Sequence, residues 1–253
     1  MSLQTIRTDQ RTKTQRAIAL EEQFGAHNYH PLPVVLDSGK GVFVWDVEGK
    51  RYYDFLSAYS AVNQGHCHPR LVQVMQEQAA KLTLTSRAFY NSVLGEYERT
   101  ACELFGYDKL LPMNTGAEAV ETAMKMARKW GYEKKGIQAN AARIIVCEGN
   151  FHGRTISIIS ASTDPESNSG FGPYTPGFVV IPYDDIPALE QALQDPLVCA
   201  FLVEPIQGEK GVYTPADDYI PKAIAACKRN NVLFIADEIQ TGIARTGRLL
   251  CSV

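Results

Sequence analysis

A run of apolar residues at 232–236 ends in an acid, Asp237, and this feature constrains the fold more than any other. The run is too short for a helix and too apolar for a strand with one face in water, so it predicts an interior strand of a parallel sheet. Ligands of such sheets bind just outside the carboxyl ends of the strands, which is where Asp237 would lie. A buried carboxylate there needs a positively charged partner, and an ordinary cap of the following turn is the alternative.

Strand-like and helix-like patterns alternate through the second half of the chain. Strands are predicted at 110–113, 144–147, 178–181, 198–203 and 232–236, and helices near 117–130, 154–161, 186–194 and 217–230. This alternation predicts an α/β fold, with a mostly parallel sheet that carries helices on both faces. Earlier in the chain, residues 41–46 and 50–55 alternate like two strands around a turn, which predicts a hairpin.

Composition and charge exclude several classes of protein. The chain has 253 residues, 45% hydrophobic and 21% charged, with a net charge of -3, so neither nucleic acid nor an anionic membrane is expected as a partner. The longest apolar run, at 198–203, is far too short to span a bilayer. The six cysteines include no Cys-x-x-Cys pair, which favours reduced core residues over disulfides or zinc, and we expect no metal site.

The same features predict a cytoplasmic protein. The N-terminal segment carries four basic residues with only one acid among them, and no signal-peptide core follows. These residues are Arg7, Arg11, Lys13 and Arg16, with Asp9 as the acid. They are also compatible with the remnant of an organelle-targeting arm, so the mitochondrial matrix is the alternative if a targeting segment has been removed.

The predicted helix start at 115–117 is suited to an anion. The chain leaves a predicted strand, turns at small residues and enters a helix, so the backbone amides of Thr115, Gly116 and Ala117 would face outward at the strand end. The helix dipole favours an anion there, and a phosphate would fit. An ordinary capped helix start, with Asn114 or Thr115 as the cap, is the alternative.

Two other loops that follow predicted strands carry candidate binding residues. In the first, Phe151 and His152 offer flat rings for a planar heterocycle, and Arg154 offers a guanidinium for a carboxylate. In the second, Glu204 and Glu209 offer carboxylates for a cation in the pocket or for Arg154. The alternatives are core packing for the rings, a solvated position for Arg154, and simple turn formation for the two acids.

Four segments together resemble the class-III aminotransferases of fold type I, which use pyridoxal phosphate. They are GNFHGRT at 149–155, EPIQGE at 204–209, ADEIQTG at 236–242 and RTG at 245–247. The resemblance continues through HNYHPLP at 27–33, FLSAYSAVNQG at 55–65, HCHP at 66–69, LTLTSRAFY at 82–90 and FGP at 171–173. So many segments in one order are highly specific. The resemblance implies an N-terminal segment and hairpin of the small domain at 1–60, and a partial pyridoxal-phosphate-binding large domain at 61–253.

The resemblance also implies a set of cofactor-binding residues. Asp237 would be the catalytic partner of the pyridine nitrogen and would keep it protonated, so that the ring acts as an electron sink. Phe151 would stack on the ring beside His152, and Gln240 would hydrogen-bond the phenolic oxygen. The phosphate would bind at the helix start, to Thr115, Gly116 and Ala117.

A second implied set binds the substrates. Tyr29 and Arg154 would bind the substrate carboxylate, and Tyr59 would shape the pocket. Glu209 would be a gate that occupies a pocket arginine while the diamine is bound and frees it for the oxo acid, with Glu204 on the same loop. Tyr29 is the most diagnostic residue, because it favours ornithine over acetylornithine or 4-aminobutyrate.

The implied reaction moves the δ-amino group of L-ornithine to 2-oxoglutarate, which gives glutamate 5-semialdehyde and glutamate. Because fold-type-I enzymes build each active site at a dimer interface, a homodimer is implied as well. Another class-III ω-aminotransferase, acting on acetylornithine or 4-aminobutyrate, is the alternative.

One family feature has no match in the chain. The Schiff-base lysine of the family follows the RTG segment, so we expect the large domain to be truncated before it, and the chain to be inactive alone. We favour the N-terminal portion of an intact enzyme, since the motifs that are present are intact for catalysis. A noncatalytic fragment or interaction module is the other interpretation.

Overall fold

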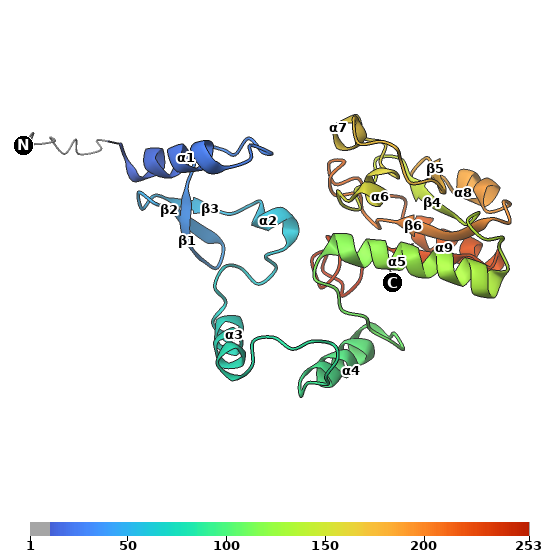
Figure 1. Ribbon diagram of the computed structural model, residues 1–253, viewed down its shortest axis with the longest axis horizontal. Helices are drawn as coiled ribbons and strands as arrows, with labels where there is room; N and C mark the ends of the chain where they lie inside the picture. The colour runs from blue at the N-terminus through green and yellow to red at the C-terminus, as the bar shows by residue number, and fades with distance from the viewer. Residues whose placement is uncertain (1–10, 253) are drawn as a thin grey trace, which may run out of the picture. The chain divides into compact units, whose positions relative to one another are not determined.

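The structure is a computed structural model that describes residues 11–252 (Figure 1). The chain divides into two compact units between Tyr90 and Asn91, and each unit is described by itself. The division near residue 60 that the family resemblance implies stays a prediction. Arg7 and Asp9 of the basic N-terminal segment lie outside the described residues. No helix in residues 11–252 has both the length and the apolarity that crossing a bilayer requires.

The first unit contains an antiparallel sheet. Its described elements are α1 (Lys13–Phe24), β1 (Leu36–Lys40), β2 (Phe43–Asp46), β3 (Arg51–Tyr53), α2 (Ser57–Ser60) and α3 (Pro69–Lys81). The strands pair in the order β1-β2-β3, with both pairs antiparallel. Strands β2 and β3 form the hairpin that the alternating sequence predicts, so this prediction is confirmed.

Local contacts explain the turn of this hairpin. The carboxylate of Asp46 accepts hydrogen bonds from the backbone N–H groups of Glu48 (3.0 Å) and Lys50 (2.8 Å). Gly49 has a φ of 88°, a conformation that glycine adopts without steric cost. The hydroxyl of Tyr52 donates to the other oxygen of Asp46 at 2.8 Å. The residues of the turn therefore fix the hairpin themselves.

The second unit contains a parallel sheet. Its described strands are β4 (Arg143–Cys147), β5 (Phe178–Ile181), β6 (Val198–Val203) and β7 (Leu233–Ala236). They pair in the order β5-β4-β6-β7, and each pair is parallel. Its described helices are α4 (Leu94–Phe105), α5 (Gly116–Trp130), the π-helix η1 (Gly131–Lys135), α6 (Ile156–Ile159), α7 (Pro165–Asn168), α8 (Ile186–Ala192) and α9 (Tyr219–Arg229).

Helices cover both faces of the parallel sheet (Figure 1). On one face, Phe201 of β6 belongs to a buried cluster with Leu189 of α8 and Ala223 of α9. On the other face, Leu202 of β6 belongs to a cluster with Val120 of α5. Phe201 and Leu202 are adjacent, and successive residues of a strand point to opposite faces. The predicted α/β fold with helices on both faces is confirmed.

Three details differ from the sequence-based expectations. Residues 110–113 do not form a strand in the described chain, where three of the four are exposed and Pro112 has no N–H to donate. Strand β7 lies at the edge of the described sheet and not in its interior. Its residues are only half-buried, because β6 pairs with it on one side alone. The helix expected at 154–161 is a single turn, α6.

Candidate active site

The candidate site lies in the second unit, at the edge of the sheet where β4, β6 and β7 end. Because these strands are parallel, the loops that follow them leave the sheet at the same edge. The loops begin at Glu148, Glu204 and Asp237. The backbone N–H of Asp237 donates to the carbonyl of Val203 at 2.8 Å, so the acid lies directly on the end of the sheet.

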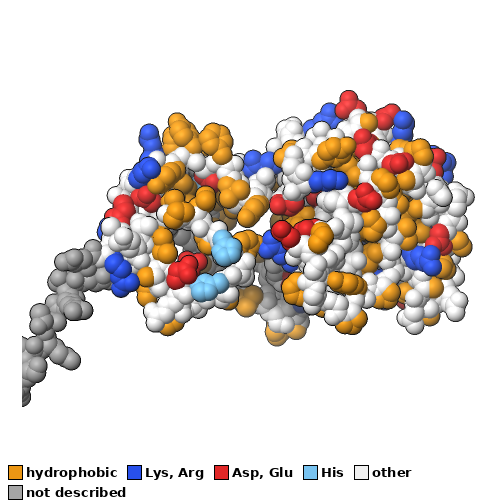
Figure 2. All heavy atoms as spheres, turned by 90° about the horizontal axis from the view of Figure 1, so that it is seen from above, with side chains coloured by type: hydrophobic (Ala, Val, Ile, Leu, Met, Phe, Trp, Pro, Cys, Tyr) orange, Lys and Arg blue, Asp and Glu red, His pale blue; other side chains and the backbone are white. Residues whose placement is uncertain are grey.

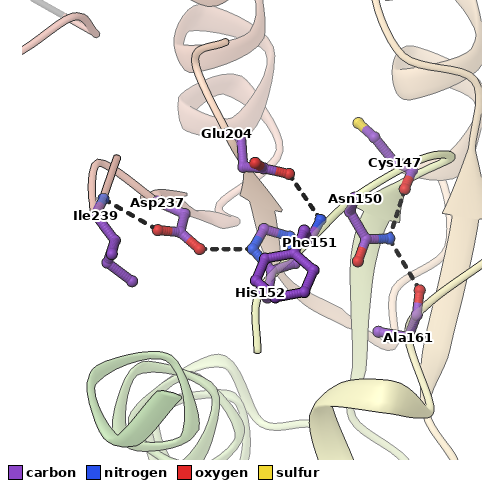
Figure 3. Close-up of polar contacts among 8 residues, drawn as sticks. All are labelled: Cys147, Asn150, Phe151, His152, Ala161, Glu204, Asp237 and Ile239. Atoms are coloured by element: carbon purple, nitrogen blue, oxygen red, sulfur yellow. Dashed lines mark hydrogen bonds and ion pairs between the residues drawn. The ribbon is translucent and has the colours of Figure 1, made fainter. Parts of the chain in front are cut away.

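Asp237 contacts His152 in the interior of this edge (Figure 3). Nδ1 of His152 lies 2.7 Å from Oδ2 of Asp237, and the two side chains are only 1% and 4% exposed. The other oxygen, Oδ1, accepts the backbone N–H of Ile239 at 3.2 Å. Asp237 therefore caps the following turn and also has a buried side-chain partner, while its pairing with a cofactor nitrogen stays a prediction.

The pairing with His152 was not expected from the sequence, which placed that ring only beside a cofactor. The two residues are 85 positions apart, so no local pattern reports their contact. The available signal was that each one follows a strand of the same parallel sheet. Nε2 of His152 is buried and has no hydrogen-bond partner among the described residues.

The start of α5 lies beside the loop that follows β7. Thr115 is the N-cap, and its hydroxyl accepts a backbone N–H of the first turn at 3.2 Å. The N–H groups of Gly116 and Ala117 belong to the same turn, where a helix provides no partners of its own. A Cβ added at Gly116 would lie 2.9 Å from Cδ1 of Ile239, so the backbone approaches this loop as closely as glycine permits. The expected anion-binding helix start is thus at the same edge as Asp237, although no strand precedes it.

The loop after β4 also contacts α5. A Cβ added at Gly153 would lie 3.2 Å from the Cβ of Ala117. The carboxylate of Glu121, one turn further along α5, accepts hydrogen bonds from the hydroxyls of Thr155 and Ser157. These contacts pack the start of α5 against the loop that carries Phe151 and His152.

Phe151 is held through its backbone. Its N–H donates to Oε1 of Glu204 at 2.9 Å (Figure 3). The side-chain amide of Asn150 donates to the carbonyls of Cys147 (2.6 Å) and Ala161 (2.9 Å), which anchors the loop on both sides. The guanidinium of Arg154 is exposed and lies 5.8 Å from the centre of the Phe151 ring.

Glu204 is a buried carboxyl group. Only 7% of the residue is exposed, and burial raises its pKa from 4.5 to about 7, although it accepts the N–H of Phe151. In the structure this carboxyl holds the loop that carries Phe151. A direct contact with substrate stays a prediction.

Gln240 and Glu209 form a second polar pair at the site. The side-chain amide of Gln240 donates to Oε1 of Glu209 at 2.9 Å, and Glu209 is exposed. A Cβ added at Gly208 would lie 1.7 Å from Oε1 of Gln240, so any larger residue there would displace this side chain. The two residues expected to hold the cofactor oxygen and to act as a gate are thus in direct contact.

Tyr29 and Tyr59 belong to the first unit. Both are exposed, by 50% and 57% respectively. Their expected contacts with substrate therefore stay predictions. The described residues contain no group of three or more histidine, cysteine, aspartate or glutamate side chains that could hold a metal ion.

The fold and this edge of the sheet define a class of protein. Residues 24–253 match the class-III aminotransferase family, and the chain belongs to this family. The chain is 64% identical over 237 residues to the mitochondrial ornithine aminotransferase of Drosophila ananassae, a match that covers 94% of the chain and 55% of the relative. The chain therefore spans about half the length of the curated relatives it matches.

Solved aminotransferase structures share the fold. An ornithine aminotransferase from Toxoplasma gondii, described as having partial occupancy of PLP at its active site, is 53% identical with a TM-score of 0.93, over 94% of this chain and 56% of that chain. An acetylornithine aminotransferase from Elizabethkingia anophelis is 60% identical with a TM-score of 0.83, over 95% of this chain and 57% of that chain. Ornithine, in the name of the first enzyme, is the amino donor that the sequence analysis expects. Acetylornithine, in the name of the second, is one of the alternative donors given there.

Proposed function

We propose that the polypeptide carrying this chain transfers the δ-amino group of L-ornithine to 2-oxoglutarate and uses pyridoxal phosphate as its cofactor. The products are glutamate 5-semialdehyde and glutamate. The observation that carries the proposal is the buried contact between Asp237 and His152 at the sheet edge that α5 also approaches. The relatives named as ornithine aminotransferases supply the substrate pair.

The described residues fit this cofactor. Asp237 provides a buried carboxylate for a protonated pyridine nitrogen, and the first turn of α5 provides amides for a phosphate. The close approach at Gly116 leaves no space for a side chain between the start of α5 and Ile239. When bound, pyridoxal phosphate supplies an electron sink for the carbanion that forms at the amino-bearing carbon.

The residues around the ring position have separate tasks. Asp237 would hold a proton on the ring nitrogen, and His152 fixes the carboxylate by donating to its Oδ2. Phe151 would stack on the ring, and Glu204 fixes Phe151 through its backbone N–H. Gln240 would bind the phenolic oxygen, and Thr115, Gly116 and Ala117 would hold the phosphate.

The substrate contacts of this proposal are those that the family resemblance implies. Arg154 and Tyr29 bind the substrate carboxylate, and Tyr59 limits the pocket. Glu209 acts as the gate between the diamine and the oxo acid, and the amide of Gln240 orients its carboxylate at 2.9 Å. This contact links the gate to the cofactor position through one side chain.

The proposal includes a homodimer. Hydrophobic side chains are exposed on both units (Figure 2), and those on α3 and α4 are large. Met75 is 71% exposed, Val74 61%, Tyr97 58% and Leu104 54%, which suits an interface more than a surface in water. The mitochondrial name of the Drosophila ananassae relative supports the mitochondrial matrix as the compartment.

Three alternatives are distinguished by experiment. The similarity to the acetylornithine aminotransferase from Elizabethkingia anophelis supports acetylornithine as another donor. A 4-aminobutyrate enzyme and a noncatalytic module are the other two alternatives. Steady-state rates of the polypeptide with ornithine, N-acetylornithine and 4-aminobutyrate as donors decide between them. A preference for ornithine is expected, and a clear preference for another donor would overturn the proposal.

The role of Asp237 is tested in the same assay. Asp237→Asn should lower kcat by about a hundredfold or more, because the ring nitrogen loses its charged partner. The matched control is Asp185→Asn, which alters the N-cap of α8 in the same unit. Equal effects of the two substitutions would contradict the cofactor role of Asp237.

A further inference from the structure

The segment Ser57–Ser60, which forms α2, is a left-handed turn. Its four residues have φ values of 48°, 49°, 55° and 71°, and none of them is glycine. An L-residue in this conformation is strained, because its Cβ lies too close to the following carbonyl oxygen. Such strain persists only where the surroundings impose it, and strained residues cluster at functional sites. Tyr59, expected at the substrate pocket, is one of these four residues.

Asp54 is the residue that holds this turn at its start. Its Oδ1 accepts the backbone N–H groups of Leu56 (3.2 Å) and Ser57 (2.8 Å). The hydroxyl of Ser57 donates back to the carbonyl of Asp54 at 3.3 Å. One carboxylate oxygen therefore fixes Ser57, the first residue of the strained segment, and Leu56 before it.

The second oxygen of Asp54 is held by a histidine. Nε2 of His66 lies 2.7 Å from Oδ2, and the side chains of His66 and Asp54 are only 28% and 17% exposed. The hydrogen bond from His66 lowers the pKa of Asp54, as do the backbone N–H groups that it accepts. Both oxygens of an ionised carboxylate are thus engaged.

His66 is itself fixed by the antiparallel sheet. Its backbone exchanges two hydrogen bonds with Gly41, at 2.8 and 2.9 Å. A Cβ added at Gly39 of β1 would lie 2.7 Å from Cγ of His66, so the ring rests directly on the backbone of β1. Asp54 is also tied to the sheet, because its N–H donates to the carbonyl of Val42 at 2.9 Å. The sheet therefore holds both His66 and Asp54 in place, and Asp54 in turn holds the start of the turn.

We propose that Asp54, fixed by His66, is a positioning residue that sets Tyr59 for the choice of substrate. This inference rests on the proposed function, which places Tyr59 at the substrate pocket. Tyr59 is 57% exposed, so the left-handed backbone of the turn sets the direction in which its side chain leaves the chain. The contacts of Asp54 hold the start of the left-handed turn, which begins two residues before Tyr59.

The first test measures the turn without any assay of activity. Asp54→Ala should speed hydrogen exchange at the amides of residues 56 and 57 by about tenfold or more, the effect of losing one hydrogen bond to a charged group. The control is Asp46→Ala, since Asp46 also accepts backbone N–H groups in this unit but lies at the hairpin turn. Unchanged exchange in Asp54→Ala would overturn the proposal.

The second test uses the polypeptide that carries this chain and compares ornithine with N-acetylornithine. Asp54→Ala should lower the ratio of their kcat/KM values by about tenfold, and Asp54→Asn should retain most of the ratio, since its side-chain oxygen still accepts the N–H of Ser57. Asp46→Ala should leave the ratio unchanged. A fall in activity that is equal for both substrates would show a merely structural role and overturn the proposal.

A double-mutant cycle separates action through Tyr59 from a general effect. In a Tyr59→Ala background, Asp54→Ala should change the ratio by less than about twofold, because residues that act through one contact are not additive. Full additivity would overturn the proposal. If the unaltered polypeptide does not turn over ornithine, the proposed function falls together with the substrate part of this inference. An unchanged ratio in an active Asp54→Ala enzyme refutes this inference alone.

Discussion

The buried carboxyl of Glu204 makes stability depend on pH in a defined direction. Burial raises its pKa from 4.5 to about 7 in the folded chain, whereas the unfolded chain keeps the ordinary value. Between these two values the unfolded state releases the proton and the folded state keeps it. Stability from this group is therefore fully present below about pH 4.5 and is lost as the pH rises through about 7. One pKa unit corresponds to about 1.4 kcal/mol, so the total loss is about 3 kcal/mol.

Glu204→Gln removes this dependence while it keeps an oxygen that accepts the N–H of Phe151. The free energy of unfolding should match that of the unaltered protein below about pH 4.5, and should exceed it by about 3 kcal/mol at pH 8. Urea unfolding followed by circular dichroism at several pH values between 4.5 and 8 measures the difference.

Glu209→Gln is the matched control, because Glu209 lies on the same loop and is exposed. Its profile of unfolding free energy against pH should keep the slope of the unaltered protein. Parallel profiles for Glu204→Gln and the unaltered protein would refute the reasoning, since they would show that the folded chain does not hold a proton on this carboxyl.

Two further predictions concern packing. Gly208→Ala places a Cβ 1.7 Å from Oε1 of Gln240, so it should displace Gln240 from Glu209 and weaken pyridoxal phosphate binding by about tenfold. A fluorescence titration with the cofactor measures this, and Gly95→Ala, where a Cβ meets nothing within 4 Å, should bind normally. Phe201→Ala should lower the free energy of unfolding by about 3–5 kcal/mol, because this ring is 0% exposed in the core. Urea unfolding checks the value, and a loss below about 1 kcal/mol would contradict the assigned packing.

Elements with a strong local signal were predicted correctly. The hairpin of β2 and β3 follows from its alternating strands and from Asp46, whose side-chain hydrogen bonds reach at most six residues along the chain. The four apolar runs that became β4 to β7 each carry their own periodicity and turn signals. The family was also recognisable, since its motifs are short continuous segments.

Elements that depend on a neighbour were predicted less well. Residues 110–113 look like a strand, but a strand exists only where another strand pairs with it, and Pro112 weakens any pairing. An apolar run does not reveal whether one or two strands flank it, so β7 was expected in the interior and lies at an edge. Glu204 was recognised as an acid on a loop, without its contact to the N–H of Phe151.

The sequence by itself determined the order of strands and helices, the acid at the end of β7 and the glycine at the start of α5. These depend on periodicity and on turn residues, which act over a few positions along the chain. Only the tertiary structure decided that Asp237 meets His152, that the buried Glu204 accepts the N–H of Phe151, and that the turn at Tyr59 is left-handed. Strand order and packing bring distant residues together, and the free energy of those contacts overrides local preference.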